Sequence, residues 1–136
     1  MERSPLVELL EAVDRLDVDA VVALCTPECR FMTVDGRHAH GRPAVGRLLS
    51  DFLAVLRSTS HEITEQWHLG DVWIAEVLAT YEMRDWLRLE QLPRAFVVRT
   101  GADGIRDVRV YGARERQLSD RMSEPTRVGG RRILPL

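Results

Sequence analysis

The sequence predicts an α+β domain in which a conical, curved antiparallel sheet wraps around three N-terminal helices and encloses one cavity. Two features support this prediction. Residues 72–84 and 88–99 have the pattern of two long strands, and a Gly-Ala-Asp-Gly turn at 101–104 leads into a third strand that ends near Tyr111. Apolar residues at helical spacing and one short strand come before them. Because the helices come first and the sheet follows, we expect one core with the helices on one face of the sheet.

The length of 136 residues is that of a single domain with one core. We expect this domain to span residues 1–116. The stretch 117–136 contains two prolines and a Gly-Gly pair, so it is predicted to be an irregular extension.

Composition and charge narrow the class of protein. Hydrophobic residues make up 45% of the chain and charged residues 29%, which are ordinary values for a globular domain. No apolar run approaches the roughly 20 residues of a membrane-spanning helix, and the N-terminus lacks the order of a signal peptide. We therefore expect no membrane partner and a cytoplasmic location. The net charge is −2 and no basic stripe is present, so nucleic acid is not expected as a partner.

Two cysteines, Cys25 and Cys29, could form a redox pair, half of a metal site, or two buried free thiols. No second pair of Cys or His residues at ligand spacing completes a metal site, so free thiols are favoured. We expect neither a metal nor a cofactor.

Capping residues mark three helix starts. Ser4 with Pro5 marks the first, Asp17 marks the second, and a Gly-Arg-Pro sequence at 41–43 marks the third. Pro27 prevents the second helix from continuing. Apolar side chains follow each start at helical spacing, so each helix should bury one face. These are Leu6, Leu9, Leu10, Val13 and Leu16, then Val18, Val21, Val22 and Cys25, then Val45, Leu48, Leu49, Phe52 and Leu56.

Two shorter segments also alternate with period two, as strands do. Residues 29–34 are predicted to be a short strand with Cys29, Phe31 and Thr33 on one face. In residues 61–69 the alternating set is Ile63, Glu65, Trp67 and Leu69.

Alternation along residues 72–84 determines which side chains enter the cavity. The face from Trp73 to Met83 is apolar or aromatic, and we assign it to the inside. The opposite face carries Glu76 and Glu82. A shift of one residue would exchange the two faces and bring both carboxylates into the cavity, where one could be held protonated for acid–base chemistry.

Several short motifs occur in a characteristic order between residues 5 and 116. They are Asp17-Val18-Asp19-Ala20-Val21 followed by Pro27-Glu28-Cys29, Gly41-Arg42-Pro43-Ala44-Val45, Gly70-Asp71-Val72 with Glu76, Leu92-Pro93, and Gly104-Ile105 with Arg109 and Tyr111. This combination resembles the SnoaL-like branch of the nuclear-transport-factor-2-like superfamily. The resemblance implies a conical pocket and a homodimer formed through the outer face of the sheet. Members of the superfamily include ketosteroid isomerase, limonene-type epoxide hydrolases, polyketide cyclases and non-catalytic binding proteins.

The resemblance also implies where catalytic residues would lie. The positions of the isomerase's tyrosine and two acids are occupied here by Leu9, Thr33 and Ala95. The positions of the epoxide hydrolase's five polar residues are occupied by Phe31, Thr33, Val77, Ala79 and Val110. None of these side chains can transfer a proton, and general acid–base catalysis needs a titratable group within reach. We therefore do not expect either of these two reactions.

Tyr81 is the polar side chain that we most expect inside the cavity, because it lies on the apolar face. Its hydroxyl could bind a ligand or a backbone group of the core. The catalytic group remains open, with Tyr81, Glu76, Glu82 and His38 as candidates, whereas His61 and His68 are interpreted as structural. The residues expected to contact a ligand are Phe31, Thr33, Trp67, Trp73, Val77, Tyr81 and Val110.

Two functions are consistent with this pattern. The first is binding of a small hydrophobic molecule, polyketide-like or terpenoid, by a cyclase or isomerase that works through positioning and a few hydrogen bonds. The alternative is a non-catalytic dimeric module that binds a ligand or a protein. An open pocket that contains Tyr81 and Thr33 would favour the first function. A pocket filled by Phe31, Trp67 and Trp73 would favour the second.

Overall fold

The computed structural model describes residues 3–113, 127–128 and 131–132 of the chain. These residues form three helices, a six-stranded curved sheet and a separate pair of two-residue strands. The helices are α1 (Pro5–Asp14), α2 (Val18–Leu24) and α3 (Arg42–Ala54). The strands are β1 (Cys25–Met32), β2 (His38–His40), β3 (Leu56–Leu69), β4 (Val72–Met83), β5 (Arg88–Gly101), β6 (Gly104–Gly112), β7 (Arg127–Val128) and β8 (Arg131–Arg132).

The three predicted helix starts are confirmed. The Ser4 hydroxyl accepts a hydrogen bond from the backbone N–H of Val7 at 3.2 Å, and Oδ1 of Asp17 accepts one from the N–H of Ala20 at 3.0 Å. Gly41 precedes α3 with a φ of 87°, in the left-handed region that favours glycine. Local sequence therefore sets where each helix begins.

The first strand, β1, begins at Cys25, four residues earlier than predicted. The additional residues include Pro27, and the register of β1 against β6 shifts between Cys25 and Arg30. They form an irregular stretch in which the missing N–H of a proline costs little. The prediction missed this stretch because it does not alternate.

The sheet is mixed, with the strand order β2-β1-β6-β5-β4-β3. The pairs from β3 to β6 are antiparallel, but β1 and β6 are parallel, with Phe31 opposite Val108. The curved sheet that the sequence predicts as antiparallel therefore contains one parallel pair. Alternation in a sequence identifies strands, but it does not show which distant strands become neighbours.

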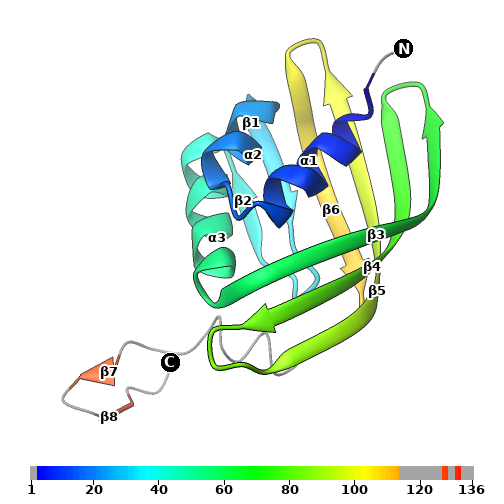
Figure 1. Cartoon of the computed structure of the whole chain (residues 1–136). Coiled ribbons are helices and arrows are strands. Elements are labelled where there is room, and N and C mark those ends of the chain that lie inside the picture. The colour runs from blue at the N-terminus through cyan, green and yellow to red at the C-terminus, as the bar shows by residue number, and fades with distance from the viewer. Residues whose placement is uncertain (1–2, 114–126, 129–130, 133–136) are drawn as a thin grey trace.

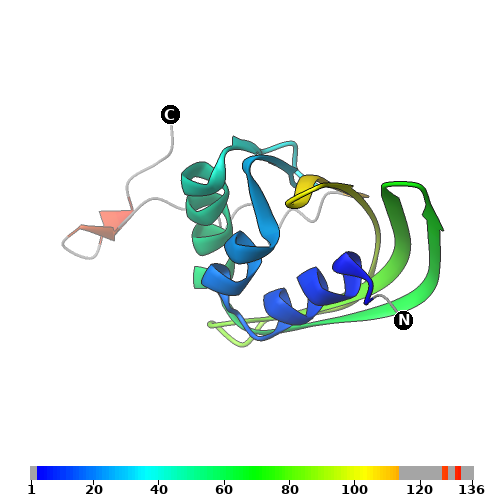
Figure 2. The same ribbon diagram turned by 90° about the horizontal axis from the view of Figure 1, so that it is seen from above.

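The long strands curve around the N-terminal helix. In Figure 2, β3 and β4 bend around α1, while α3 packs beside β1. Figure 1 shows the same arrangement from the side, with all three helices on one side of the sheet. The result is the α+β cone that the sequence predicts. No helix in the described residues is long and apolar enough to cross a membrane.

The register of β4 is the predicted one. Every second side chain from Ala75 to Met83 is buried, whereas Glu76 is exposed. Glu82 lies on the outer face and forms an ion pair with Arg57 of β3. The shifted register, which would bring both carboxylates into the cavity, is therefore not adopted.

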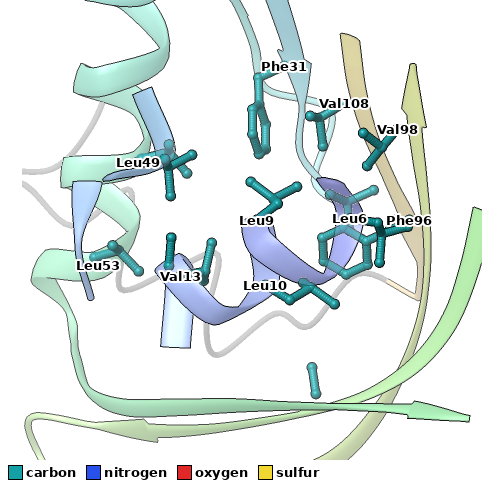
Figure 3. Packing of buried hydrophobic residues seen from close by; sticks show 14 of the residues in the cluster. Leu6, Leu9, Leu10, Val13, Phe31, Leu49, Leu53, Phe96, Val98 and Val108 are labelled. Carbon is teal, nitrogen blue, oxygen red and sulfur yellow. The ribbon is translucent and has the colours of Figure 1, made fainter. Parts of the chain in front are cut away.

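The inner side of α1 forms the centre of the core. Figure 3 shows Leu9 pointing from α1 toward Phe31. Burial of a leucine side chain contributes about 1.5–3 kcal/mol, so the stripe of buried side chains on this helix holds α1 on the sheet. The same packing sets the position of Asp14 at the end of the helix. The buried residues of this stripe are Leu6, Leu9, Leu10 and Val13.

The predicted extension, residues 117–136, lies largely outside the described residues. Within it, β7 and β8 pair in antiparallel fashion, with Arg127 opposite Arg132.

Candidate functional site

A cavity of about 80 Å³ lies between the concave face of the sheet and helices α1 and α3. Five side chains with polar groups line it: Thr33, Asp35, His61, Tyr81 and Arg94. The rest of the wall consists of Val13, Phe31, Val34, Leu48, Leu49, Phe52, Phe96 and Val110. An apolar enclosure with a few polar groups is the usual form of a small-molecule site.

His61 lines this cavity and pairs with Asp14, the last residue of α1. Nδ1 of His61 lies 2.6 Å from Oδ1 of Asp14, and the backbone N–H of His61 donates to Oδ2 of Asp14 at 3.1 Å. The side chain of His61 is 2% exposed. Because both carboxylate oxygens bind the same residue, the ring is held in place, and Nε2 is the nitrogen left to meet a ligand.

Aromatic rings surround His61 and Tyr81. The rings of His61 and Phe96 meet edge to face with centroids 5.6 Å apart, and those of His61 and Tyr81 lie 6.1 Å apart. Phe52 packs edge to face on Tyr81 at 5.6 Å. Edge-to-face packing restrains aromatic rings. The imidazole and the phenol are therefore close enough for one small molecule to contact both.

Arg94 brings a buried guanidinium to the same wall. The residue is 5% exposed, and its Nη1 donates to the backbone carbonyls of Pro93 at 3.0 Å and Ala113 at 3.1 Å. Its Nε is buried and has no hydrogen-bond partner among the described residues. The arrangement depends on Gly112, since a Cβ at that position would lie 2.9 Å from Nη1.

Burial raises the pKa of Tyr81, and the positive charge of Arg94 offsets part of that rise. The hydroxyl therefore stays protonated at neutral pH. It can donate a hydrogen bond to a ligand.

Asp35 reaches the cavity, but its two oxygens are already bonded. The Thr33 hydroxyl donates to Oδ1, and Nε of Arg37 lies 2.9 Å from Oδ2. All three residues belong to the turn between β1 and β2. Asp35 is therefore fixed within its own turn, and its charge is balanced there.

These groups can support acid–base chemistry in an apolar enclosure. His61 can accept and return a proton at Nε2 while Asp14 holds the ring, and Tyr81 can donate a hydrogen bond. Among the described residues, no three His, Cys, Asp or Glu side chains are grouped so that they could hold a metal ion.

The structure brings four of the seven predicted ligand-contacting residues to the cavity wall. These are Phe31, Thr33, Tyr81 and Val110. Val77 is buried in the core but does not line the cavity; its neighbour across the β4–β5 pair is Arg94, which does.

The two tryptophans of the predicted set lie elsewhere. Trp67 is 48% exposed and faces Ile74 on the outer side of the sheet, because a bulge in β3 between Ile63 and Glu65 exchanges the faces of the residues that follow. Trp73 stays on the inner side but does not line the cavity. Its ring stacks on that of His68, with the ring centroids 3.5 Å apart.

Of the four predicted catalytic candidates, Tyr81 is the one that lines the cavity in the described structure. Glu76 is exposed on the outer face. Glu82 is paired with Arg57, which lowers the pKa of that carboxyl group. His38 is exposed on β2, because Ala39 takes the inward position of this short strand. None of these three can contact a molecule in the cavity.

Sequence reasoning missed Asp14 and Arg94 and interpreted His61 as structural. The sequence did contain a signal for His61 and Arg94, because each is a polar residue at an inward position of an alternating strand. His61 shares its face with Thr59, and Arg94 shares its face with Phe96. The pairing of His61 with Asp14 had no local signal.

The fold and site define a class of protein: a small α+β cone with a cavity whose polar groups come from several elements. The SnoaL-like domain family matches residues 6–115, so this chain belongs to the SnoaL-like family. No curated protein matches the chain.

Solved structures share the fold at low sequence identity. A hypothetical protein with a ketosteroid isomerase-like fold from Catenulispora acidiphila, in complex with trimethylamine, gives a TM-score of 0.75 at 16% identity over 83% of this chain and 88% of that one. An LEH-like epoxide hydrolase of M. tuberculosis gives 0.69 at 18% identity over 80% of each chain. SalBIII, an epoxide hydrolase/cyclase-like enzyme with a role in pyran ring formation in the polyether salinomycin, gives 0.69 at 17% identity over 80% of this chain and 88% of that one. At these identities the similarity establishes the fold.

Proposed function

We propose that the chain binds a small, mainly apolar molecule in the cavity and transfers a proton on it, as a cyclase or an isomerase. The observation that carries this proposal is the 2.6 Å contact of Asp14 with His61, whose side chain lines an apolar cavity. An imidazole held by a carboxylate is an effective general acid and base, because imidazoles gain and lose a proton near neutral pH.

Both ring nitrogens of His61 have a role in this proposal. With Nδ1–H donated to Asp14, the lone pair on Nε2 takes a proton from the bound molecule, and the carboxylate stabilises the imidazolium that forms. Tyr81 donates a hydrogen bond to the oxygen on which negative charge develops. Nε2 then returns the proton to another atom of the same molecule, so atoms and charge balance without a second reactant. Isomerisation and ring closure both fit this balance, and a general base contributes about 10²–10⁴-fold.

The acid–base pair does not use the positions of ketosteroid isomerase, which hold Leu9, Thr33 and Ala95 here. The proposal therefore rests on the geometry of this cavity. The description of SalBIII as epoxide hydrolase/cyclase-like supports the cyclase class. The apolar walls are compatible with the polyketide-like or terpenoid substrates that the family resemblance implies.

The alternative is a non-catalytic module that binds a ligand. The small size of the cavity favours it, because about 80 Å³ is well below the roughly 300–1,000 Å³ of most ligand pockets. In that case Asp14 and His61 would fix α1 to β3, and His61 would exchange no proton with a ligand.

Hydrogen–deuterium exchange at carbon separates the two functions. Small cyclic ketones, from cyclobutanone to cyclohexanone, are incubated with the protein in D₂O, and loss of the α-proton signals is followed by NMR. The wild type should accelerate exchange of a ketone that fits, and His61→Gln should slow the protein-dependent rate at least tenfold. His68→Gln is the matched control and should keep the rate, since His68 stacks on Trp73 outside the cavity.

The module function would be supported instead if a ketone shifts the NMR signals of cavity residues but exchanges no faster than in buffer. Equal exchange rates for the wild type and His61→Gln would also overturn the assignment of His61.

We also propose that two copies pair through the outer face of the sheet, as the family resemblance implies. Trp67 and Ile74 are neighbours across β3 and β4 on this face and are both exposed, and Tyr111 of β6 is exposed as well. Exposed apolar side chains gathered on one sheet face favour association.

Charge on the same face supports a two-fold arrangement. Glu65 and Glu76 lie opposite each other on β3 and β4. Arg99 and Arg109 lie on β5 and β6, toward β1, and share the single carboxylate of Asp107, so this side keeps a net positive charge. In a two-fold pair, the basic side of one copy can meet the acidic side of the other.

We propose a cytoplasmic location. The two cysteines support it, because Cys25 and Cys29 are buried free thiols, as expected for a reducing compartment.

A further inference from the structure

The guanidinium of Arg94 is the least compensated charged group at the cavity. Its Nη1 donates to two backbone carbonyls, and its guanidinium also donates to the Tyr81 hydroxyl oxygen. Among the described residues its Nε has no partner, and it forms no ion pair with a carboxylate. A buried charge is costly unless an opposite charge or a full set of hydrogen bonds offsets it. In the part of the chain that the structure describes, Arg94 therefore has no anionic partner.

The carboxylate that lines the cavity, Asp35, and the one that holds His61, Asp14, are both engaged with other groups. Asp14 binds His61 through both oxygens. Asp35 accepts from Thr33 and pairs with Arg37. Neither can neutralise Arg94 without giving up the contacts that hold it in place.

The Tyr81 hydroxyl adds a second donor to this part of the wall. It is buried beside Arg94, whose charge acts on it, and both side chains line the same cavity. The surroundings are apolar rings and valines, including Phe31, Phe96 and Val110. An ionised oxygen placed there would accept from both donors, and exclusion of water would strengthen the attraction.

We propose that the cavity selects an organic anion, an apolar molecule with one carboxylate or phenolate oxygen that binds to Arg94 and Tyr81. This deepens the proposed function and rests on it only in that the same cavity holds the ligand. A neutral ligand would leave the guanidinium without a counter-charge. The small volume limits the apolar part to a short chain or one small ring.

The specificity of the site is tested with benzoate and benzamide, which differ in charge but have nearly the same shape. By NMR titration, the wild type should bind benzoate at least tenfold more tightly than benzamide. Arg94→Met should bind the two equally. Arg106→Met is the matched control, since Arg106 is exposed and paired with Asp71, and it should keep the preference.

A phenolate gives an independent spectroscopic signature. 4-Nitrophenol absorbs visible light when ionised, so selective binding of the anion lowers its apparent pKa and raises the absorbance at fixed pH when protein is added. Benzoate should reverse the change, and Arg94→Met should abolish it. If benzoate binds while 4-nitrophenol does not ionise, the anion is a carboxylate, whereas the opposite result identifies a phenolate.

Equal affinity of the wild type for benzoate and benzamide, with no ionisation of 4-nitrophenol, would overturn the anion site. This result needs no variant and is therefore independent of how Arg94→Met folds. Ketone exchange that depends on His61 would then still support proton transfer. Conversely, benzoate binding that depends on Arg94, without any ketone exchange, would leave a binding module specific for anions.

Discussion

Asp14 binds His61 through both of its carboxylate oxygens, although the two residues are 47 positions apart. Asp14 is the last residue of α1, where the helix dipole disfavours a negative charge. The imidazole and the backbone N–H of His61 bind the Asp14 carboxylate and so offset this unfavourable interaction with the helix dipole. The pair therefore combines a structural role, holding α1 to β3, with a geometry suited to proton transfer.

Replacing Asp14 by Asn should release the imidazole of His61. An amide presents only one acceptor oxygen, so one of the two hydrogen bonds is lost, and unfolding should become easier by about 1–3 kcal/mol. Nitrogen NMR of the imidazole should show Nδ1 protonated in the wild type and mixed tautomers in Asp14→Asn. Asp19→Asn, at an exposed position of α2, is the control and should change stability by no more than about 0.5 kcal/mol. An unchanged tautomer in Asp14→Asn would contradict the role given to Asp14.

Tyr81 should ionise only in strongly alkaline solution. Its pKa in the folded protein is raised, chiefly by burial, so folding favours the protonated form. This preference stabilises the folded protein at any pH below the pKa of Tyr81 in the unfolded chain, which is near 10. The stabilisation is lost as the pH rises through the higher pKa of Tyr81 in the folded protein. The chain has two tyrosines, so Tyr111→Phe leaves Tyr81 as the source of the tyrosinate absorbance. That absorbance should develop above about pH 10 in the folded variant and near pH 10 in guanidinium. Identical titrations in the two solvents would contradict the burial of the hydroxyl.

The same titration tests the influence of Arg94. Because the charge of Arg94 lowers the pKa of Tyr81, Arg94→Met in the Tyr111→Phe background should move the tyrosinate absorbance to still higher pH. A shift to lower pH would mean that the guanidinium does not act on the phenol.

Local signals in the sequence predicted the elements well. The caps at Ser4 and Asp17 and the alternation from Trp73 to Met83 depend on neighbours in the chain, and the structure confirms them. The parallel pairing of β1 with β6 depends on residues far apart in sequence, and alternation has no bearing on it.

The site was harder to predict, for two physical reasons. One bulge in β3 reverses the inside and outside of the residues that follow, so Trp67 lies on the outer face. The functional pair also joins the end of a helix to a strand, and Asp14 acquires its role only when α1 packs across β3. A single histidine at an inward strand position, such as His61, is where a search for such pairs should begin.

Leu9→Ala should destabilise the protein by about 2–5 kcal/mol. Leu9 is fully buried between α1 and the sheet, and its removal leaves a cavity that the neighbouring strands cannot close. Leu69→Ala is the control: Leu69 is 85% exposed, so its loss should change the unfolding free energy by no more than about 0.5 kcal/mol. Denaturant unfolding of both variants measures the difference. Equal midpoints would show that α1 does not pack as described.

Trp67→Glu should separate the proposed dimer into single chains. Trp67 lies opposite Ile74 on the outer face, and a carboxylate there would be buried next to apolar side chains of the second copy and close to Glu65 and Glu76. Light scattering coupled to size-exclusion chromatography should give twice the chain mass for the wild type and the single-chain mass for Trp67→Glu. Trp86→Ser is the control, because Trp86 is also exposed, at 67% against 48% for Trp67, but lies in the turn between β4 and β5, where it contacts Arg57. It should remain a dimer. A wild type that elutes at the mass of one chain at tens of micromolar would contradict the dimer. The exposed side chains of Trp67, Ile74 and Tyr111 would then not be explained by pairing of two copies.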